Sequence, residues 1–310
     1  MAEERWTIGR LLQWTTEYFR NRGSATPRLD AELLLAHALG CQRIELYTGY
    51  DREPDEEARS RFRELVRRRG AGEPVAYLVG YREFFSLPFR VTPAVLIPRP
   101  ETELLVTTLL DLAKTFPAEK VVEVCDVGTG SGVIAVCVAK HLPSARVTAI
   151  DISDEALKVA RENAELHGVV DRIEFVQSDL LTGLPQNRRF DFIVSNPPYV
   201  REDELGELPP DVRDYEPRIA LLAGQRGTEV IESLLPQAVA HLNPGGWLLL
   251  EINPRVAEEV KNLITNQPEL EFVDIRKDLA RLPRVAMARR KANGVVNGKE
   301  DNSLSRGTIE

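Results

Sequence analysis

Residues 121–142 read VVEVCDVGTGSGVIAVCVAKHL, an apolar run that breaks at a cluster of glycines and then resumes. The part before the break, 121–128, predicts a buried strand, and the part after it, 133–142, predicts a helix. Three glycines in five residues let the backbone turn sharply and approach a ligand closely. The candidate ligand-binding residues of this loop are Gly128, Thr129, Gly130, Ser131 and Gly132.

Acidic residues at the ends of the next two predicted strands fit the same ligand. The loop spacing is G-x-G-x-G, whereas a nicotinamide-binding loop has G-x-G-x-x-G. Asp151 lies about 20 residues beyond the loop, the usual place for a carboxylate that accepts hydrogen bonds from ribose hydroxyls. Alternatively, Asp151 caps the next helix, although Ser153 or Asp154 could do so instead. Asp179 is placed to accept from an exocyclic adenine amine, with Leu180 against the ring.

Strands and helices alternate beyond residue 120. The alternation predicts an α/β fold with a doubly wound, mostly parallel sheet that binds its ligand at the carboxyl ends of the strands. The seven predicted strands cover residues 121–128, 146–151, 172–179, 190–195, 246–252, 269–278 and 284–291. Predicted helices cover residues 133–142, 154–168 and 228–241, and another follows the fifth strand.

These features resemble the class I S-adenosylmethionine-dependent methyltransferases over about residues 120–290. In that family the glycine loop meets the amino-acid moiety of the cofactor. The resemblance therefore implies S-adenosylmethionine as the cofactor. It also implies that Asn196, after the fourth strand, faces the methyl donor.

The fourth strand ends in FIVSNPPYV, residues 192–200. Neither Pro197 nor Pro198 has an N–H group, so this corner offers acceptors and few donors. The Asn196 side-chain oxygen and the Pro197 carbonyl can accept hydrogen bonds from the two N–H groups of a planar NH₂ group. This holds the nitrogen with its lone pair towards the methyl group. The ring of Tyr199 offers a flat face for a planar NH₂-bearing group. Catalysis by Asn196, Pro197 and Tyr199 is then mostly positioning and requires no metal and no nucleophilic residue. A proline turn after an edge strand is disfavoured because residues 192–194 are apolar.

The Asn-Pro-Pro-Tyr motif is shared by amino-adenine and glutamine-amide methyltransferases, so it leaves the substrate open. Residues 73–77 (EPVAY), 95–103 (VLIPRPETE) and 215–221 (YEPRIAL) closely resemble the HemK/PrmC family, the peptide chain release factor glutamine methyltransferases. This resemblance implies that the target is the glutamine of the Gly-Gly-Gln loop in bacterial class I release factors, held by residues 196–199. The chain has Asn253 and Arg281 where the family commonly has glycine.

Four regions are expected along the chain. Residues 1–80 read as short helices, a small bundle that the resemblance implicates in recognising the release factor. Residues 81–98 suggest a hairpin or linker, and residues 99–290 form the methyltransferase domain, whose first helix opens at Pro100. The polar, aperiodic residues 291–310 predict a disordered tail.

Composition limits the remaining choices. The 310-residue chain has a net charge of −8, which argues against a large non-specific footprint on nucleic acid. No apolar run is long enough to span a membrane, and the three scattered cysteines indicate a reducing, cytoplasmic location. Two alternatives remain: an adenine-amino methyltransferase acting on nucleic acid, which would normally have a basic recognition region, and a non-catalytic cofactor-binding module, which would have a decayed loop or corner.

Overall fold

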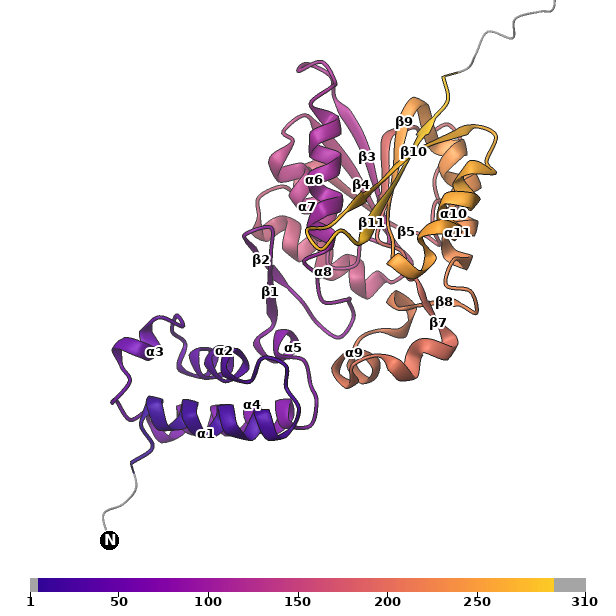
Figure 1. Cartoon of the computed structure of the whole chain (residues 1–310). Coiled ribbons are helices and arrows are strands. Elements are labelled where there is room, and N and C mark those ends of the chain that lie inside the picture. Colours follow the sequence, from indigo (N-terminus) through magenta and orange to yellow (C-terminus); the bar gives the residue numbers. More distant parts are fainter. Residues whose placement is uncertain (1–4, 293–310) are drawn as a thin grey trace, which may run out of the picture.

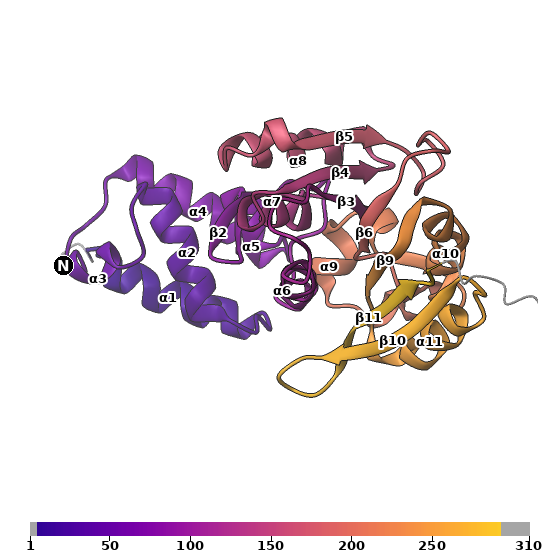
Figure 2. The same ribbon diagram turned by 90° about the horizontal axis from the view of Figure 1, so that it is seen from above.

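The computed structural model describes residues 5–292 (Figure 1). A helical region lies at one end of the molecule and an α/β sheet at the other (Figure 2), and an antiparallel hairpin joins them. The hairpin strands are β1 (Tyr81–Phe84) and β2 (Leu87–Arg90), and its buried Phe84 and Phe89 pack into the core of the sheet. The predicted disordered tail covers residues 291–310, of which 293–310 lie outside the described residues. Its first residue, Lys291, donates its backbone N–H to the Glu269 carbonyl.

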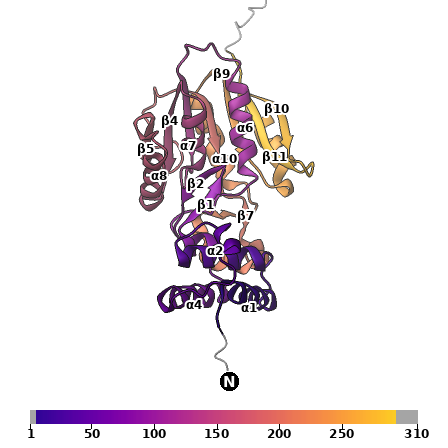
Figure 3. The same cartoon turned by 90° about the vertical axis from the view of Figure 1, so that its left-hand side faces the viewer.

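The helical region contains five helices among the described residues: α1 (Ile8–Asn21), α2 (Pro27–Leu39), α3 (Glu45–Thr48), α4 (Glu56–Gly70) and α5 (Val75–Val79). Buried Leu12, Leu34 and Phe62 join α1, α2 and α4 in one core. Figure 3 shows α2 between the α1–α4 pair and the sheet. Helix α2 begins at Pro27, and the hydroxyl of the preceding Thr26 does not cap the helix but donates to Asp30, 2.8 Å away.

The sheet has seven strands in the order β10-β11-β9-β6-β3-β4-β5, and the predicted doubly wound fold is confirmed. Strands β5, β4, β3, β6 and β9 are parallel, and β11 pairs antiparallel with β9 and β10. The strand bounds are β3 (Val122–Val127), β4 (Ala145–Asp151), β5 (Ile173–Gln177), β6 (Phe190–Ser195), β9 (Leu242–Glu251), β10 (Leu270–Lys277) and β11 (Pro283–Arg290).

Helices cover both faces of the sheet. On one face lie α6 (Thr102–Ala113), α7 (Val133–His141) and α8 (Asp154–Leu166), and on the other α10 (Glu229–His241) and α11 (Ala257–Thr265). Phe192 and Val194 of β6 pack on the first face and Ile193 on the second, so β6 is buried on both sides. The alternative of a proline turn after an edge strand is therefore wrong. Helix α6 begins at Thr102, two residues after the expected Pro100.

Strand register aligns the carboxyl ends that form the site. Val127 of β3 pairs with Ile150 of β4 and with Ser195 of β6, and Ser195 pairs with Leu250 of β9. The residues that follow these positions therefore emerge in one row along the sheet edge. They are Gly128, Asp151, Asn196 and Glu251.

The chain between β6 and α10 makes an excursion that the sequence analysis did not predict. It comprises β7 (Val200–Arg201), η2 (Glu202–Glu207), α9 (Pro210–Tyr215), η3 (Arg218–Ala220) and β8 (Leu222–Gly224). The Tyr215 hydroxyl donates to the Ala71 carbonyl at 3.2 Å, and Arg69 lies 3.6 Å from Asp211. This excursion thus touches the helical region.

Replacing Gly132 by alanine is expected to destabilise the fold more than replacing Gly23. Both glycines have a left-handed backbone, with φ near +81° and +79°, which costs an alanine about 1–2 kcal/mol. A Cβ at Gly132 would also lie 3.0 Å from the Ala160 Cβ of α8, whereas one at Gly23 would meet open space. Thermal unfolding should show the larger fall in Tm for Gly132→Ala, since each kcal/mol shifts the Tm by about 2–4 °C in domains of this size. Equal shifts would contradict the close packing of the loop on α8.

Candidate active site

A pocket of about 200 Å³ lies at the carboxyl ends of the parallel strands, as predicted. One wall is the glycine loop, another comes from the ends of β4 and β5, and a third from the Asn-Pro-Pro-Tyr corner, residues 196–199. The structure brings together most of the predicted site residues in its lining: Gly128, Thr129, Gly130, Ser131, Asp151, Asp179, Leu180, Asn196 and Pro198. Three predicted residues lie just behind or beside it: Gly132, Pro197 and Tyr199.

The glycine loop is shaped by positive φ angles and by a buried aspartate. Gly128 and Gly130 have φ of +72° and +56°, and a Cβ at either would enter open space. Asp126 accepts from the Thr129 hydroxyl at 2.6 Å and from the Ala135 N–H at 3.2 Å, which ties the loop to the start of α7. Burial raises the pKa of Asp126 to about 7. The sequence analysis gave Asp126 no role, although a carboxylate inside an apolar strand is a recognisable signal.

Asp151, at the end of β4, holds the glycine loop by a hydrogen bond. Its two carboxylate oxygens accept from the Gly130 N–H at 2.8 Å and from the Ser153 N–H at 2.9 Å. Ser153 caps α8 by accepting from the Ala156 N–H, so the alternative reading of Asp151 as the helix cap is wrong. An ionised carboxylate has about four lone-pair sites, so Asp151 keeps capacity for further donors. Burial raises its pKa.

Asp179 and Leu180 form the wall after β5. Asp179 is exposed at the pocket, and half-buried Leu180 packs against the apolar core below. Leu180 has a φ of +51°, a left-handed conformation that is costly for a leucine and typical of functional sites. The next N–H group, of Leu181, donates to the Gln237 side chain of α10 at 2.9 Å, which fixes the turn.

The corner presents an open acceptor. The Asn196 Nδ2 group donates to the Thr102 hydroxyl oxygen at 3.3 Å, and no group among residues 5–292 bonds to Asn196 Oδ1. The Ser195 hydroxyl donates to the Val127 carbonyl at 2.7 Å, which anchors the corner to β3. Pro197 is buried. Burial raises the pKa of Tyr199 to about 12, so its phenol is neutral at physiological pH.

Two distant segments roof the pocket, residues 94–99 and 217–220. Arg99 pairs with Glu216 at 2.5 Å, and the Ile97 N–H donates to the same carboxylate at 3.2 Å. Glu216 is only 4% exposed, so this pair is held inside the protein. Sequence reasoning used both segments for the family resemblance but gave Arg99, Thr102 and Glu216 no place in the site.

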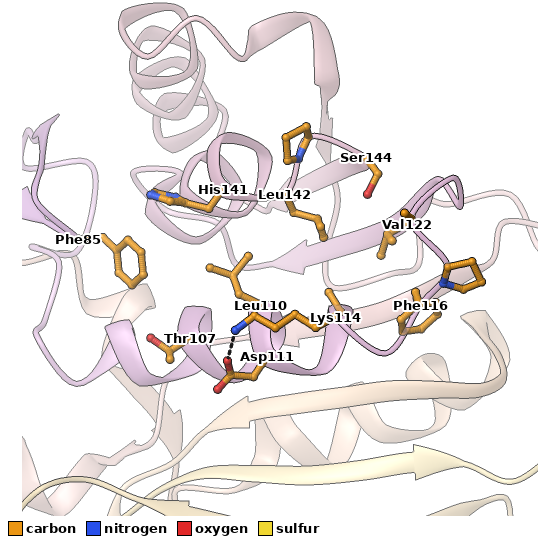
Figure 4. A pocket seen from close by; sticks show the side chains of 14 residues that line it. Phe85, Thr107, Leu110, Asp111, Lys114, Phe116, Val122, His141, Leu142 and Ser144 are labelled. Carbon is orange, nitrogen blue, oxygen red and sulfur yellow. Dashed lines mark hydrogen bonds and ion pairs between the residues drawn. The ribbon is translucent and has the colours of Figure 1, made fainter.

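A larger groove of about 690 Å³ lies between α6 and α7, at the opposite end of β3 (Figure 4). Its walls are mainly apolar side chains, including Leu110, Phe116 and Leu142. Lys114 and Asp111 form an ion pair of 2.9 Å at its edge. The groove contains neither the glycine loop nor the corner, so we assign the chemistry to the smaller pocket.

The two departures from the family pattern lie outside the pocket lining. Arg281 is in the turn between β10 and β11 with a φ of +63°, a backbone conformation that explains why glycine suits this position. The Asn253 side chain accepts from the Arg255 N–H at 2.9 Å and starts η4 (Pro254–Val256). Asn253 lines a separate polar cavity beside Tyr199.

Two family models match separate parts of the chain. Residues 10–80 match the PrmC N-terminal domain, and residues 102–207 match the methyltransferase small domain. Within the described residues, no helix has the length and apolar character needed to cross a membrane. Among solved structures, the hMettl16 catalytic domain in complex with an RNA hairpin shares the fold, with a TM-score of 0.53, 19% identity, and 70% of this chain and 80% of that chain covered.

Curated relatives match nearly the whole length. The release factor glutamine methyltransferase of Rhodopirellula baltica is 53% identical over 90% of this chain and 95% of its own. The enzyme of Koribacter versatilis is 45% identical over 86% of this chain and 92% of its own length. The enzyme of Geobacter sulfurreducens is 42% identical over 84% of this chain and 89% of its own length. The chain therefore belongs to the release factor glutamine methyltransferase family.

Proposed function

We propose that this protein transfers a methyl group from S-adenosylmethionine to the side-chain amide nitrogen of the glutamine in the Gly-Gly-Gln loop of bacterial class I release factors. The observation that carries the proposal is the corner, where Asn196 Oδ1 is an unoccupied acceptor at the edge of the pocket. Family membership supplies the protein substrate, since the relatives are named release factor glutamine methyltransferases.

The pocket has the features that S-adenosylmethionine requires. The open space beside Gly128 and Gly130 admits the amino-acid moiety close to the backbone. Asp151 has remaining lone pairs for the ribose hydroxyls, and Asp179 and Leu180 offer an acceptor and an apolar surface to the adenine. When bound, the cofactor supplies a methyl group activated by its sulfonium charge.

The corner supports transfer to an amide by orienting a weak nucleophile. The amide lone pair is delocalised into the carbonyl, so the nitrogen must be held with that lone pair directed at the methyl carbon. Asn196 Oδ1 and the Pro197 carbonyl accept its two N–H groups. As the nitrogen gains positive charge, its N–H groups become stronger donors, so both acceptors favour the transition state over the ground state. One of the two protons is then lost to solvent, which leaves a neutral N-methyl amide.

Incubation with labelled S-adenosylmethionine and either a release factor or DNA tests the proposal. Mass spectrometry should place the label on the glutamine of the Gly-Gly-Gln loop and none on DNA. Label on adenine would instead support the nucleic-acid methyltransferase, which the net charge of −8 and the named relatives disfavour. No transfer at all would support a non-catalytic module, although the loop and corner are both intact.

We also propose that the helical region recognises the release factor and takes no part in the chemistry. A fragment starting at Gly72 keeps α5, whose Tyr77 donates to the Val95 carbonyl at 2.7 Å beneath the roof. This fragment should methylate a short Gly-Gly-Gln peptide at the full-length rate. On an intact release factor its kcat/KM should fall by at least about tenfold, equivalent to 1.4 kcal/mol of lost docking. Equal kcat/KM values for fragment and full chain on the intact factor would contradict the docking role.

A further inference from the structure

A buried carboxylate stands beside Asn196 in the row of strand ends. Because Ser195 of β6 pairs with Leu250 of β9, the next residues, Asn196 and Glu251, lie side by side at the carboxyl ends of these strands. Glu251 is 2% exposed, and its Oε2 atom is buried without a hydrogen-bond partner among the described residues. An unsatisfied buried carboxylate oxygen destabilises a fold and therefore calls for an explanation.

Thr102 connects this carboxylate to Asn196. It is the first residue of α6, is 2% exposed, and its hydroxyl oxygen accepts from Asn196 Nδ2 at 3.3 Å. The same side chain also lies beside Glu251, since its hydroxyl lowers the pKa of that carboxyl. A threonine hydroxyl has a single proton. Once that proton is donated to Glu251, the oxygen facing Asn196 can only accept.

Glu251, Thr102 and Asn196 thus form a hydrogen-bond relay. Its direction decides whether Asn196 presents its Oδ1 acceptor or its Nδ2 donor to a substrate. An asparagine amide has a donor end and an acceptor end of nearly equal shape, so only its hydrogen bonds select its orientation. We propose that Glu251 and Thr102 are positioning residues: with Glu251 ionised, they hold Asn196 Nδ2 inward and Oδ1 outward, so that Oδ1 accepts from the target NH₂. This inference rests on the proposed function and adds a control on the direction of its hydrogen bonds.

Protonation of Glu251 reverses the relay. A neutral Glu251 can donate its own proton to the Thr102 oxygen, and the Thr102 proton then turns towards Asn196. Asn196 would flip, placing its NH₂ against the NH₂ of the substrate, where neither group can accept.

The groups that face Glu251 set the pKa of its carboxyl and therefore the pH at which it becomes protonated. Burial and the charge of Glu101 raise the Glu251 pKa, while the Thr102 hydroxyl, Arg284 and Arg99 lower it, and the result is a pKa of about 7. Tyr199 also faces Glu251 and is neutral because burial raises its own pKa to about 12. Arg284 is already bound to Asp278 at 2.8 Å, and Arg99 to Glu216 at 2.5 Å. Thr102 is thus the group that directs the Glu251 charge to Asn196.

The test uses the full-length protein, a release factor and labelled S-adenosylmethionine, with kcat measured from pH 5.5 to 9 in the wild type and in four variants. Thr102→Val and Glu251→Gln should each lower kcat at pH 8 by about 10- to 100-fold, less than removal of the acceptor itself. Cofactor affinity and the KM for the release factor should stay within about threefold. Thr102→Ser should restore kcat because it restores the hydroxyl. The matched control is Thr108→Val, which removes a buried hydroxyl of α6 that bonds only to the Leu104 carbonyl.

The pH profile separates positioning from a merely structural role. In the wild type, kcat should fall about tenfold per pH unit below an apparent pKa of about 7, because protonation of Glu251 reverses the relay. Glu251→Gln should lose this acid limb. If Glu251→Gln has the same kcat and the same acid limb as the wild type, the inference is wrong. This conclusion holds even if Thr102→Val fails to fold. Failure of the wild type to label the release factor would instead overturn the proposed function, and the inference with it.

Discussion

Replacing Asn196 by alanine is expected to reduce turnover on a release factor by about 100- to 1000-fold while leaving the affinity for S-adenosylmethionine nearly unchanged. The substitution removes the Oδ1 acceptor, and loss of one preorganised hydrogen bond to a reacting group typically costs about 2.7–4 kcal/mol. We expect cofactor affinity to depend mainly on the glycine loop and on Asp151 and Asp179, and the hydrogen bonds that hold this loop do not involve Asn196. Single-turnover methylation and calorimetry measure the two quantities separately.

Conservative variants of the same corner serve as controls. Asn196→Asp keeps an oxygen of nearly the same position, so it should retain more activity than Asn196→Ala, although its charge beside the sulfonium slows methyl transfer. Tyr199→Phe should be milder than Tyr199→Ala if the ring face supports the amide. Turnover by Asn196→Ala within a few-fold of the wild type would show that Pro197 and its neighbours position the glutamine alone, and the mechanism would have to be abandoned.

Replacing Asp151 by alanine is expected to weaken S-adenosylmethionine binding by about 10- to 150-fold. A charged acceptor to hydroxyl donors is typically worth about 1.5–3 kcal/mol. The substitution also removes the hydrogen-bond partner of the Gly130 N–H, which lies 2.8 Å from the carboxylate. The glycine loop therefore loses a restraint, and the ligand loses an acceptor. Isothermal titration calorimetry with the cofactor gives the change in Kd directly.

Ser153→Ala is the matched control for Asp151→Ala. It removes the cap of α8, worth about 1 kcal/mol of stability, but leaves the Asp151 carboxylate in the pocket. We expect a lower Tm with an unchanged Kd for Ser153→Ala. An unchanged Kd for Asp151→Ala would show that the ribose assignment is wrong.

The sheet could be predicted because each of its strands has a local signature. The apolar runs at 121–128 and 190–195 are long enough to be recognised alone, and the glycines between β3 and α7 mark the turn. The excursion from 200 to 224 was missed because its strands have two or three residues, too few to show a period. The alternation of strands and helices predicted the doubly wound class, but the order of the strands came only from the structure.

The site was predicted only as far as its residues follow strand ends. Asp151 and Asp179 end predicted strands and Asn196 directly follows one, and the parallel pairing aligns these strand ends. Thr102 and Glu216 come from a helix start and a loop, and they reach the pocket through contacts over more than 90 residues of sequence. Glu251 did carry a signal, since a carboxylate ends the apolar run WLLLE, but nothing local reveals that Thr102 faces it.

The excursion after the corner joins two places that a substrate must reach. At one end Tyr215 and Asp211 rest on Ala71 and Arg69 of the helical region, and at the other Glu216 and residues 217–220 form part of the pocket roof. One short stretch of chain therefore fixes the span between the proposed docking surface and the reacting atoms. If the helical region is the docking surface, as proposed, we infer that the protein selects a glutamine by how far that residue projects from the body of its substrate, as well as by the chemistry of its amide. Proteins with a glutamine on a shorter projection would dock without reaching the methyl group.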